Sequence, residues 1–220
     1  MYITDSDTCN NQINYLKSIF NEFNLSPNSN IIDIGCGAGE QLKMLSNLGY
    51  SVKGIDINLN PQTKSTSYNL KGDFFNLNQT FDDFKFDFAY MFAPCLGSKY
   101  MNLENLFHSV NLILKPKSTF VFDCFRFYSY FDNEEIIKIK NNVTKKYVRN
   151  GDIFSCEVKI QDKIQNVLNW YYPNLQVLEK IISVSGFKIH SKHFDFNKSQ
   201  MGVFLPQLNK RRLTIVLQKN

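Results

Sequence analysis

The residues of this chain that are best suited to chemistry lie in a glycine-rich turn and in two later segments that each carry an acidic residue. The turn covers residues 35–39, GCGAG, and Asp56 and Asp73 follow in the segments GIDIN and GDFF. Glycines let a ligand approach the main chain, and free N–H groups at a helix start favour electron-rich atoms. A carboxylate at a strand end can accept hydrogen bonds from both hydroxyls of a ribose. These residue types indicate a site for a ligand that contains a nucleoside.

The spacing of the glycines narrows the class of ligand. Gly35, Gly37 and Gly39 give GxGxG, and Glu40 stands where the dinucleotide fingerprint GxGxxG has its last glycine. The negative charge of Glu40 would be unfavourable beside a pyrophosphate. No GK[ST] sequence follows the turn, which excludes a P-loop. The sequence therefore favours an adenosine ligand without phosphates.

The elements that must position these residues alternate between strands and helices. Apolar residues predict a strand over Ile31–Ile34, and leucines at helical spacing predict a helix over Glu40–Leu48, which Gly49 ends. The other elements predicted up to residue 124 are a helix over 8–24, strands at 52–57, before Gly72, at 86–91 and at 119–124, and a helix at 103–114. This order indicates a parallel, doubly wound sheet, whose strands bring their carboxyl ends to one edge.

The pattern changes after Cys124. Two alternating stretches, 142–149 and 152–160, flank Asn150-Gly151, which is a strong hairpin signal, and 163–172 supplies a possible third strand. We therefore predict an antiparallel insert within residues 126–172. A helix over Leu175–Ser185 and two strands, 187–193 and 212–218, complete the sheet.

Four segments in order, IIDIGCGAGE, GIDIN, GDFF and LKPKSTFVFDCF, resemble the class I, Rossmann-like S-adenosylmethionine-dependent methyltransferases over nearly the whole chain. The resemblance implies an α/β fold with a doubly wound, seven-stranded, mostly parallel sheet of order 3-2-1-4-5-7-6. Strand 7 would be antiparallel, helices would cover both faces, and the small antiparallel β insert would follow strand 5. The implied methyl donor is S-adenosyl-L-methionine, which leaves as S-adenosyl-L-homocysteine. The implied cofactor-binding residues are Asp33, Gly35, Cys36, Gly37, Gly39, Asp56, Ile57, Asp73, Phe74 and Met91.

The part of the chain after strand 5 resembles small-molecule methyltransferases such as the aminosugar N,N-dimethyltransferases, in which the insert closes over the acceptor. The resemblance implies methyl transfer to nitrogen or oxygen of a small molecule. A dedicated base is optional, and we assign no catalytic residue. We expect surface or packing roles for His108, His190 and His193. The residues expected to bind the acceptor are Tyr15, Tyr100, Arg126 and Tyr172.

Two alternatives remain open for the function. Residues 1–124 carry 9 Lys/Arg and 12 Asp/Glu, whereas residues 125–220 carry 16 and 8, so a basic face of an RNA or tRNA methyltransferase is one alternative. The segment FAPCLGS, with Cys95, partly resembles the cysteine element of RNA cytosine-C5 methyltransferases, and Cys124 lies where those enzymes carry a second cysteine. However, Phe92 replaces their aspartate and Leu96 interrupts the element. A catalytically silent subunit with a methyltransferase fold is the other alternative.

Composition sets the remaining expectations. The 5 scattered cysteines have no CxxC spacing, so they support neither a disulfide framework nor a metal site. The first residues are polar and acidic, and no run approaches the ~18 apolar residues of a membrane span. We expect residues 1–220 to form a single cytoplasmic methyltransferase domain, a monomer or homodimer that does not bind a membrane.

Overall fold

The computed structural model describes residues 6–57, 69–92, 102–124, 135–139, 143–151, 153–161, 163–171, 175–194 and 213–220. The helices are α1 (Ser6–Glu22), α2 (Glu40–Asn47), α3 (Leu77–Phe81), α4 (Leu103–Ile113) and α5 (Leu175–Val184), with a short 3₁₀ helix η1 (Phe74–Asn76). The strands of the first half are β1 (Asn30–Ile34), β2 (Ser51–Asp56), β3 (Asn69–Lys71), β4 (Phe86–Met91) and β5 (Leu114–Cys124). The later strands are β6 (Glu135–Ile139), β7 (Val143–Asn150), β8 (Ile153–Ile160), β9 (Lys163–Tyr171), β10 (Phe187–Phe194) and β11 (Leu213–Lys219).

Seven of these strands form one sheet in the order β10-β11-β5-β4-β1-β2-β3. The strand β1 pairs in parallel with β2 and β4, β2 pairs in parallel with β3, and β4 pairs in parallel with β5. The strand β11 is antiparallel to both of its neighbours, β10 and β5. Counted within this sheet alone, the order is 3-2-1-4-5-7-6 with strand 7 antiparallel, so the predicted topology is confirmed.

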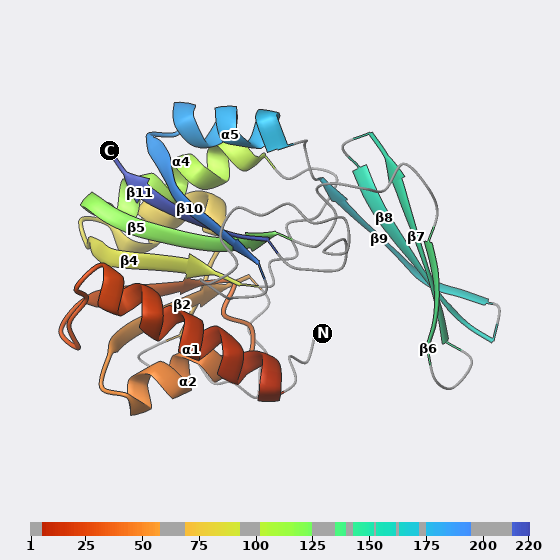
Figure 1. Cartoon of the computed structure of the whole chain (residues 1–220), viewed down its shortest axis with the longest axis horizontal. Coiled ribbons are helices and arrows are strands. Elements are labelled where there is room, and N and C mark those ends of the chain that lie inside the picture. The colour runs from red at the N-terminus through yellow and green to blue at the C-terminus, as the bar shows by residue number, and fades with distance from the viewer. Residues whose placement is uncertain are drawn as a thin grey trace.

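Helices cover both faces of the sheet, as the prediction required (Figure 1). Successive strand residues point to opposite faces, and the buried residues follow this period. Ile31 and Phe88 belong to the core beneath α1 and α2, whereas Ile32 and Ala89 belong to the core beneath α3, α4 and α5. Strands that are apolar on both sides are typical of a parallel sheet between two helical layers.

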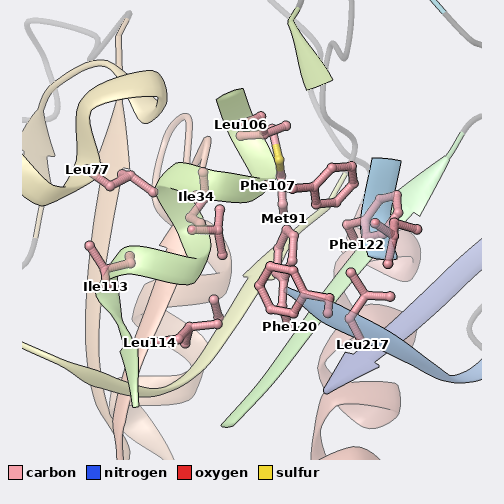
Figure 2. Packing of buried hydrophobic residues seen from close by; sticks show 14 of the residues in the cluster. Ile34, Leu77, Met91, Leu106, Phe107, Ile113, Leu114, Phe120, Phe122 and Leu217 are labelled. Atoms are coloured by element: carbon pink, nitrogen blue, oxygen red, sulfur yellow. The ribbon is translucent and has the colours of Figure 1, made fainter. Parts of the chain in front are cut away.

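The larger of the two cores is built around aromatic side chains (Figure 2). The ring of Phe107 on α4 lies 6.0 Å from that of Phe120 and 5.2 Å from that of Phe122, both on β5. All three side chains are at most 1% exposed. This packing fixes β5 beneath α4 and thereby holds the middle of the sheet, where the carboxyl ends of β1 and β4 lie.

The insert is a separate antiparallel sheet of order β6-β7-β8-β9, which extends to one side of the main sheet (Figure 1). The predicted hairpin is confirmed, because Asn150 pairs with Ile153 around Gly151, whose φ is 58°. Val158 of β8 packs against the larger core, which connects this sheet to the rest of the chain. The strand β6 was not predicted.

Two other elements differ from the prediction. The strand β5 begins at Leu114, although we expected it at residue 119. Phe86 pairs with Leu114 and Phe88 with Thr119, so the residues between them bulge out of the ladder, which accommodates a proline that has no N–H to donate. The short helix α3, after η1, was also not predicted.

Candidate functional site

The glycine turn between β1 and α2 has a backbone that suits glycine. Gly35, Gly37 and Gly39 have φ values of 79°, 53° and 76°, in the left-handed region where other residues are strained. The N–H groups of Gly35 and Cys36 donate to the carbonyl oxygen of Ile55 at 2.7 and 3.2 Å, and Gly39 N–H donates to Cys36 O at 2.8 Å. These bonds fix the turn against β2.

The space around each glycine shows which side of the turn is open. A Cβ atom on Gly35 or Gly37 would meet no atom within 4 Å. A Cβ atom on Gly54 of β2 would lie 2.4 Å from Leu42 Cδ1 and 2.8 Å from Cys36 Sγ. Gly54 therefore lets the turn pack closely on β2, whereas Gly35 and Gly37 border open space that a ligand can fill.

Asp56 lies at the end of β2, directly beside the turn. Its Oδ2 accepts a hydrogen bond of 2.9 Å from the N–H of Gly37. The next residue, Ile57, is 51% exposed and leaves an apolar surface next to the carboxylate. The structure thus brings together the turn, Asp56 and Ile57, three parts of the predicted cofactor site.

Asp33 on β1 is a buried carboxyl group near the same turn. It is 3% exposed, and its Oδ2 has no hydrogen-bond partner among the described residues. Burial raises its pKa to about 7, the nearby Tyr90 hydroxyl lowers it, and the charge of Asp56 raises it again. Tyr90 is the residue opposite Asp33 on β4, and its buried hydroxyl likewise has no hydrogen-bond partner within the described ranges. Because buried polar atoms are normally paired, both groups are suited to a polar ligand.

Other residues of the predicted cofactor set have structural contacts. Cys36 is 5% exposed, and burial raises the pKa of its thiol, so it acts as a small apolar filler. The Asp73 carboxylate accepts a bond of 2.9 Å from Phe75 N–H and caps η1. The Phe74 ring lies 4.7 Å from that of Phe75 and packs against the larger core. Met91 ends β4, but its side chain is 2% exposed in that core (Figure 2).

Of the predicted acceptor-binding residues, only Tyr15 lies in the described part of the chain. It is 3% exposed on α1, and its hydroxyl forms a 2.7 Å hydrogen bond with Nδ1 of His193 on β10. Burial, followed by the charge of Glu22, raises the pKa of the Tyr15 phenol, so the phenol stays protonated in this hydrogen bond, whose direction is set by the tautomer of His193. Tyr100, Arg126 and Tyr172 lie outside the described residues.

The other two histidines lie in the described part of the chain, whereas the cysteines do so only in part. Cys9 and Cys36 are buried, Cys95 lies outside the described residues, and only the main chain of Cys124 is described. His190 pairs with Glu22 on α1 at 2.8 Å, and His108 is exposed on α4.

Sequence reasoning missed one buried polar group near the turn, Gln12. Gln12 lies on α1 and is 0% exposed, and its Oε1 accepts a 2.9 Å bond from Nε2 of Gln41 at the start of α2. One signal in the sequence could have found Gln12. It lies four residues before Leu16, so both side chains are on the same, buried face of the helix.

The described residues contain no group of three or more His, Cys, Asp or Glu side chains that could hold a metal ion. Among the same residues, no helix is long and apolar enough to cross a membrane.

A family model described as a methyltransferase domain matches residues 11–191. The chain therefore belongs to the methyltransferase domain family. An uncharacterized protein of Methanocaldococcus jannaschii is 35% identical over 120 residues, which are 52% of this chain and 44% of that protein. The matched part thus spans less than half the length of that relative.

Solved structures show the same fold at low sequence identity. An S-adenosylmethionine-dependent methyltransferase from Clostridium acetobutylicum superposes with a TM-score of 0.73 at 15% identity, covering 99% of this chain and 93% of that one. The CcbJ methyltransferase from Streptomyces caelestis gives 0.71 at 13% identity, covering 98% and 90%. CalS10, an amino pentose methyltransferase from Micromonospora echinaspora solved with S-adenosylmethionine bound, gives 0.61 at 13% identity, covering 97% and 91%.

Proposed function

We propose that this chain transfers a methyl group from S-adenosylmethionine to a nitrogen or oxygen atom of a small molecule. The observation that carries the proposal is the acidic, partly unpaired set of groups around the open glycine turn. Asp56 is positioned to accept from ribose hydroxyls, and exposed Ile57 offers an apolar surface to the adenine. Asp33 has an unpaired carboxylate oxygen for an ammonium group. Carboxylates at this edge suit a ligand with positive charges and disfavour a phosphate.

The chain's own task in such a reaction is to position two molecules and exclude water. The bound cofactor supplies a methyl group that its sulfonium already activates. The fixed turn and the carboxylates beside it hold one reactant, and orientation alone can supply ~7–11 kcal/mol of the barrier. Tyr15 is the described residue proposed to contact the acceptor. It lies on α1, and its hydroxyl contacts His193 near the carboxyl end of β10. Tyr100, Arg126, Tyr172 and the insert of residues 126–172 complete the proposed acceptor pocket.

The hydrogen bonds and ion pairs of the basic residues favour a small acceptor over RNA. In the basic half of the chain, Lys159 pairs with Glu157 at 3.0 Å and Lys192 pairs with Glu179. The Lys219 ammonium donates to two main-chain carbonyl oxygens at 2.7 and 2.8 Å. The two carboxylates offset the charges of Lys159 and Lys192, and the Lys219 ammonium is held by its own main chain, so these three groups are less available to bind phosphates. The likeness to CalS10, described as an amino pentose methyltransferase, supports an amine on a sugar-sized molecule as the first acceptor to test.

Calorimetric titration with S-adenosylmethionine and S-adenosylhomocysteine tests the cofactor. We expect the wild-type protein to bind both, and Asp56→Ala to bind at least about tenfold more weakly, because hydrogen bonds to a charged group are lost. Asp83→Ala removes an exposed carboxylate from the turn after α3 and is the matched control, expected to bind normally. No binding by the wild type, or full affinity in Asp56→Ala, would refute the cofactor assignment.

Transfer of a labelled methyl group tests the acceptor. A panel of small amines and hydroxyl compounds is compared with total RNA at two salt concentrations. We expect label in a small amine or alcohol. Label only in RNA, with steep salt dependence, would replace this acceptor class by nucleic acid. Cofactor binding without transfer to any member of the panel would instead favour a silent subunit.

A further inference from the structure

Gln12 is a buried polar residue whose hydrogen-bonding groups are only partly satisfied by the described part of the chain. Its side chain is 0% exposed, and its Nε2 has no hydrogen-bond partner among the described residues. The neighbouring positions Ile13 and Leu16 belong to the core beneath α1. An unpaired amide N–H in such surroundings costs free energy, so a partner that arrives with a ligand would explain the glutamine.

Two contacts hold Gln12 beside the glycine turn. Its Oε1 accepts from Nε2 of Gln41 at 2.9 Å, and Gln41 lies only two residues after Gly39. One turn earlier on α1, the Cys9 thiol donates to Glu40 Oε2 at 3.3 Å. Since Oε1 is already occupied, the unpaired Nε2 offers its hydrogens close to the place where the turn enters α2.

The unpaired acceptor of the same region is Asp33. Tyr90 lies opposite Asp33 in the ladder between β1 and β4. It also lies close to α1, because the Phe92 ring is 5.4 Å from the Tyr90 ring and 6.4 Å from the Tyr15 ring on α1. The region therefore combines an unpaired donor, Gln12 Nε2, with an unpaired acceptor, Asp33 Oδ2. Such a pair is complementary to the two charges of an amino-acid group, whose carboxylate accepts and whose ammonium donates.

We propose that Gln12 Nε2 binds the carboxylate of the amino-acid end of the cofactor, an inference that rests on the proposed function, in which Asp33 receives the ammonium group. A neutral donor is physically well suited to this position. A lysine or arginine there would form an ion pair with Asp33 and remove the acceptor that the ammonium needs. An amide donates to a carboxylate without neutralising the neighbouring acid.

A pair of ligands isolates this contact. S-adenosylhomocysteine carries the amino-acid end, and 5′-methylthioadenosine has the same thioether and adenosine without it. We expect Gln12→Leu to lower the calorimetric affinity for S-adenosylhomocysteine about tenfold or more and to leave the affinity for 5′-methylthioadenosine unchanged. Gln12→Glu should lower the affinity for S-adenosylhomocysteine further, because two carboxylates then repel each other, and it provides the same comparison if the leucine variant does not fold.

The control is Asn14→Leu, which removes an exposed amide from the same helix and should bind both ligands normally. Equal losses for both ligands in the Gln12 variants would overturn the proposal, since they would indicate damage to the site as a whole. Unchanged affinity for S-adenosylhomocysteine, or tighter binding in Gln12→Glu, would also overturn it. A wild-type protein that binds neither ligand would instead refute the proposed function, so the two failures are distinguishable.

Discussion

The carboxyl group of Asp33 should make cofactor binding depend on pH. Burial raises its pKa to about 7, with a lowering contribution from the Tyr90 hydroxyl and a raising one from Asp56. A bound ammonium group stabilises the ionised carboxylate, so binding to the protonated form must release a proton. We therefore expect S-adenosylhomocysteine to bind more weakly as the pH falls through neutrality.

The size of this effect follows from the pKa. A group with a pKa near 7 is roughly 10% ionised at pH 6 and roughly 90% at pH 8, so the affinity should fall about tenfold over this interval. That factor corresponds to about 1.4 kcal/mol of binding free energy. In the ligand-free protein the sign is reversed: the folded state holds this proton more tightly than the unfolded state. The contribution of Asp33 to stability therefore falls as the pH rises from about 4 to about 7.

Calorimetric titration at pH 6, 7 and 8, in two buffers with different ionisation enthalpies, measures both the affinity and the proton release. Asp33→Asn keeps the shape of the side chain and cannot titrate, so its affinity should be lower and independent of pH. The affinity of the wild type for 5′-methylthioadenosine, which lacks the ammonium group, should not fall towards acid pH. A flat wild-type profile for S-adenosylhomocysteine, or the same slope in Asp33→Asn, would refute the reasoning.

Two further variants test the packing around the site. Gly54→Ala should lower the free energy of unfolding by about 1–3 kcal/mol in urea titrations, because the added Cβ overlaps Leu42 and Cys36, and it should weaken S-adenosylhomocysteine binding; an unchanged midpoint would contradict this. Tyr15→Phe should lower the free energy of unfolding by about 1–3 kcal/mol, because it removes the hydroxyl that is hydrogen-bonded to the buried His193 ring. A double-mutant cycle with His193→Leu checks that contact, and strictly additive losses would show that the hydrogen bond does not contribute.

The order of the main sheet could be predicted because each central strand can be recognised from its own residues. Ile31–Ile34 and Phe86–Met91 are apolar runs between polar segments, and motifs of one family occur in the matching order. The start of β5 could not be predicted, because the proline in LKPKS is typical of a turn and only the pairing of Leu114 with Phe86 makes that segment part of the ladder. The strand β6 is followed by Asn141 and Asn142 without the glycine that made Asn150-Gly151 a strong hairpin signal.

The site was predictable to the extent that it depends on local sequence. The glycine turn and Asp56 lie together because they occupy the ends of neighbouring strands. The position of Gln12 beside the turn depends on how α1 packs against the start of α2, 29 residues away in the sequence. The spacing of the apolar residues shows only that one side of α1 is buried. Asp73 illustrates a further limit, because an aspartate that caps a short helix has the same local signature as one that awaits a ligand.

The bond between Tyr15 and His193 joins residues 178 positions apart, and β11 lies between β10 and β5 in the sheet. While the chain is being synthesised, the glycine turn emerges early, yet α1 has no Tyr15–His193 contact until nearly the whole sequence has been made. Contacts of such long range form late and slowly, because a large loop must close first. Until then β5 is an open edge that could pair with other chains. The time spent waiting for the last two strands is therefore the period in which this protein is most exposed to misassembly.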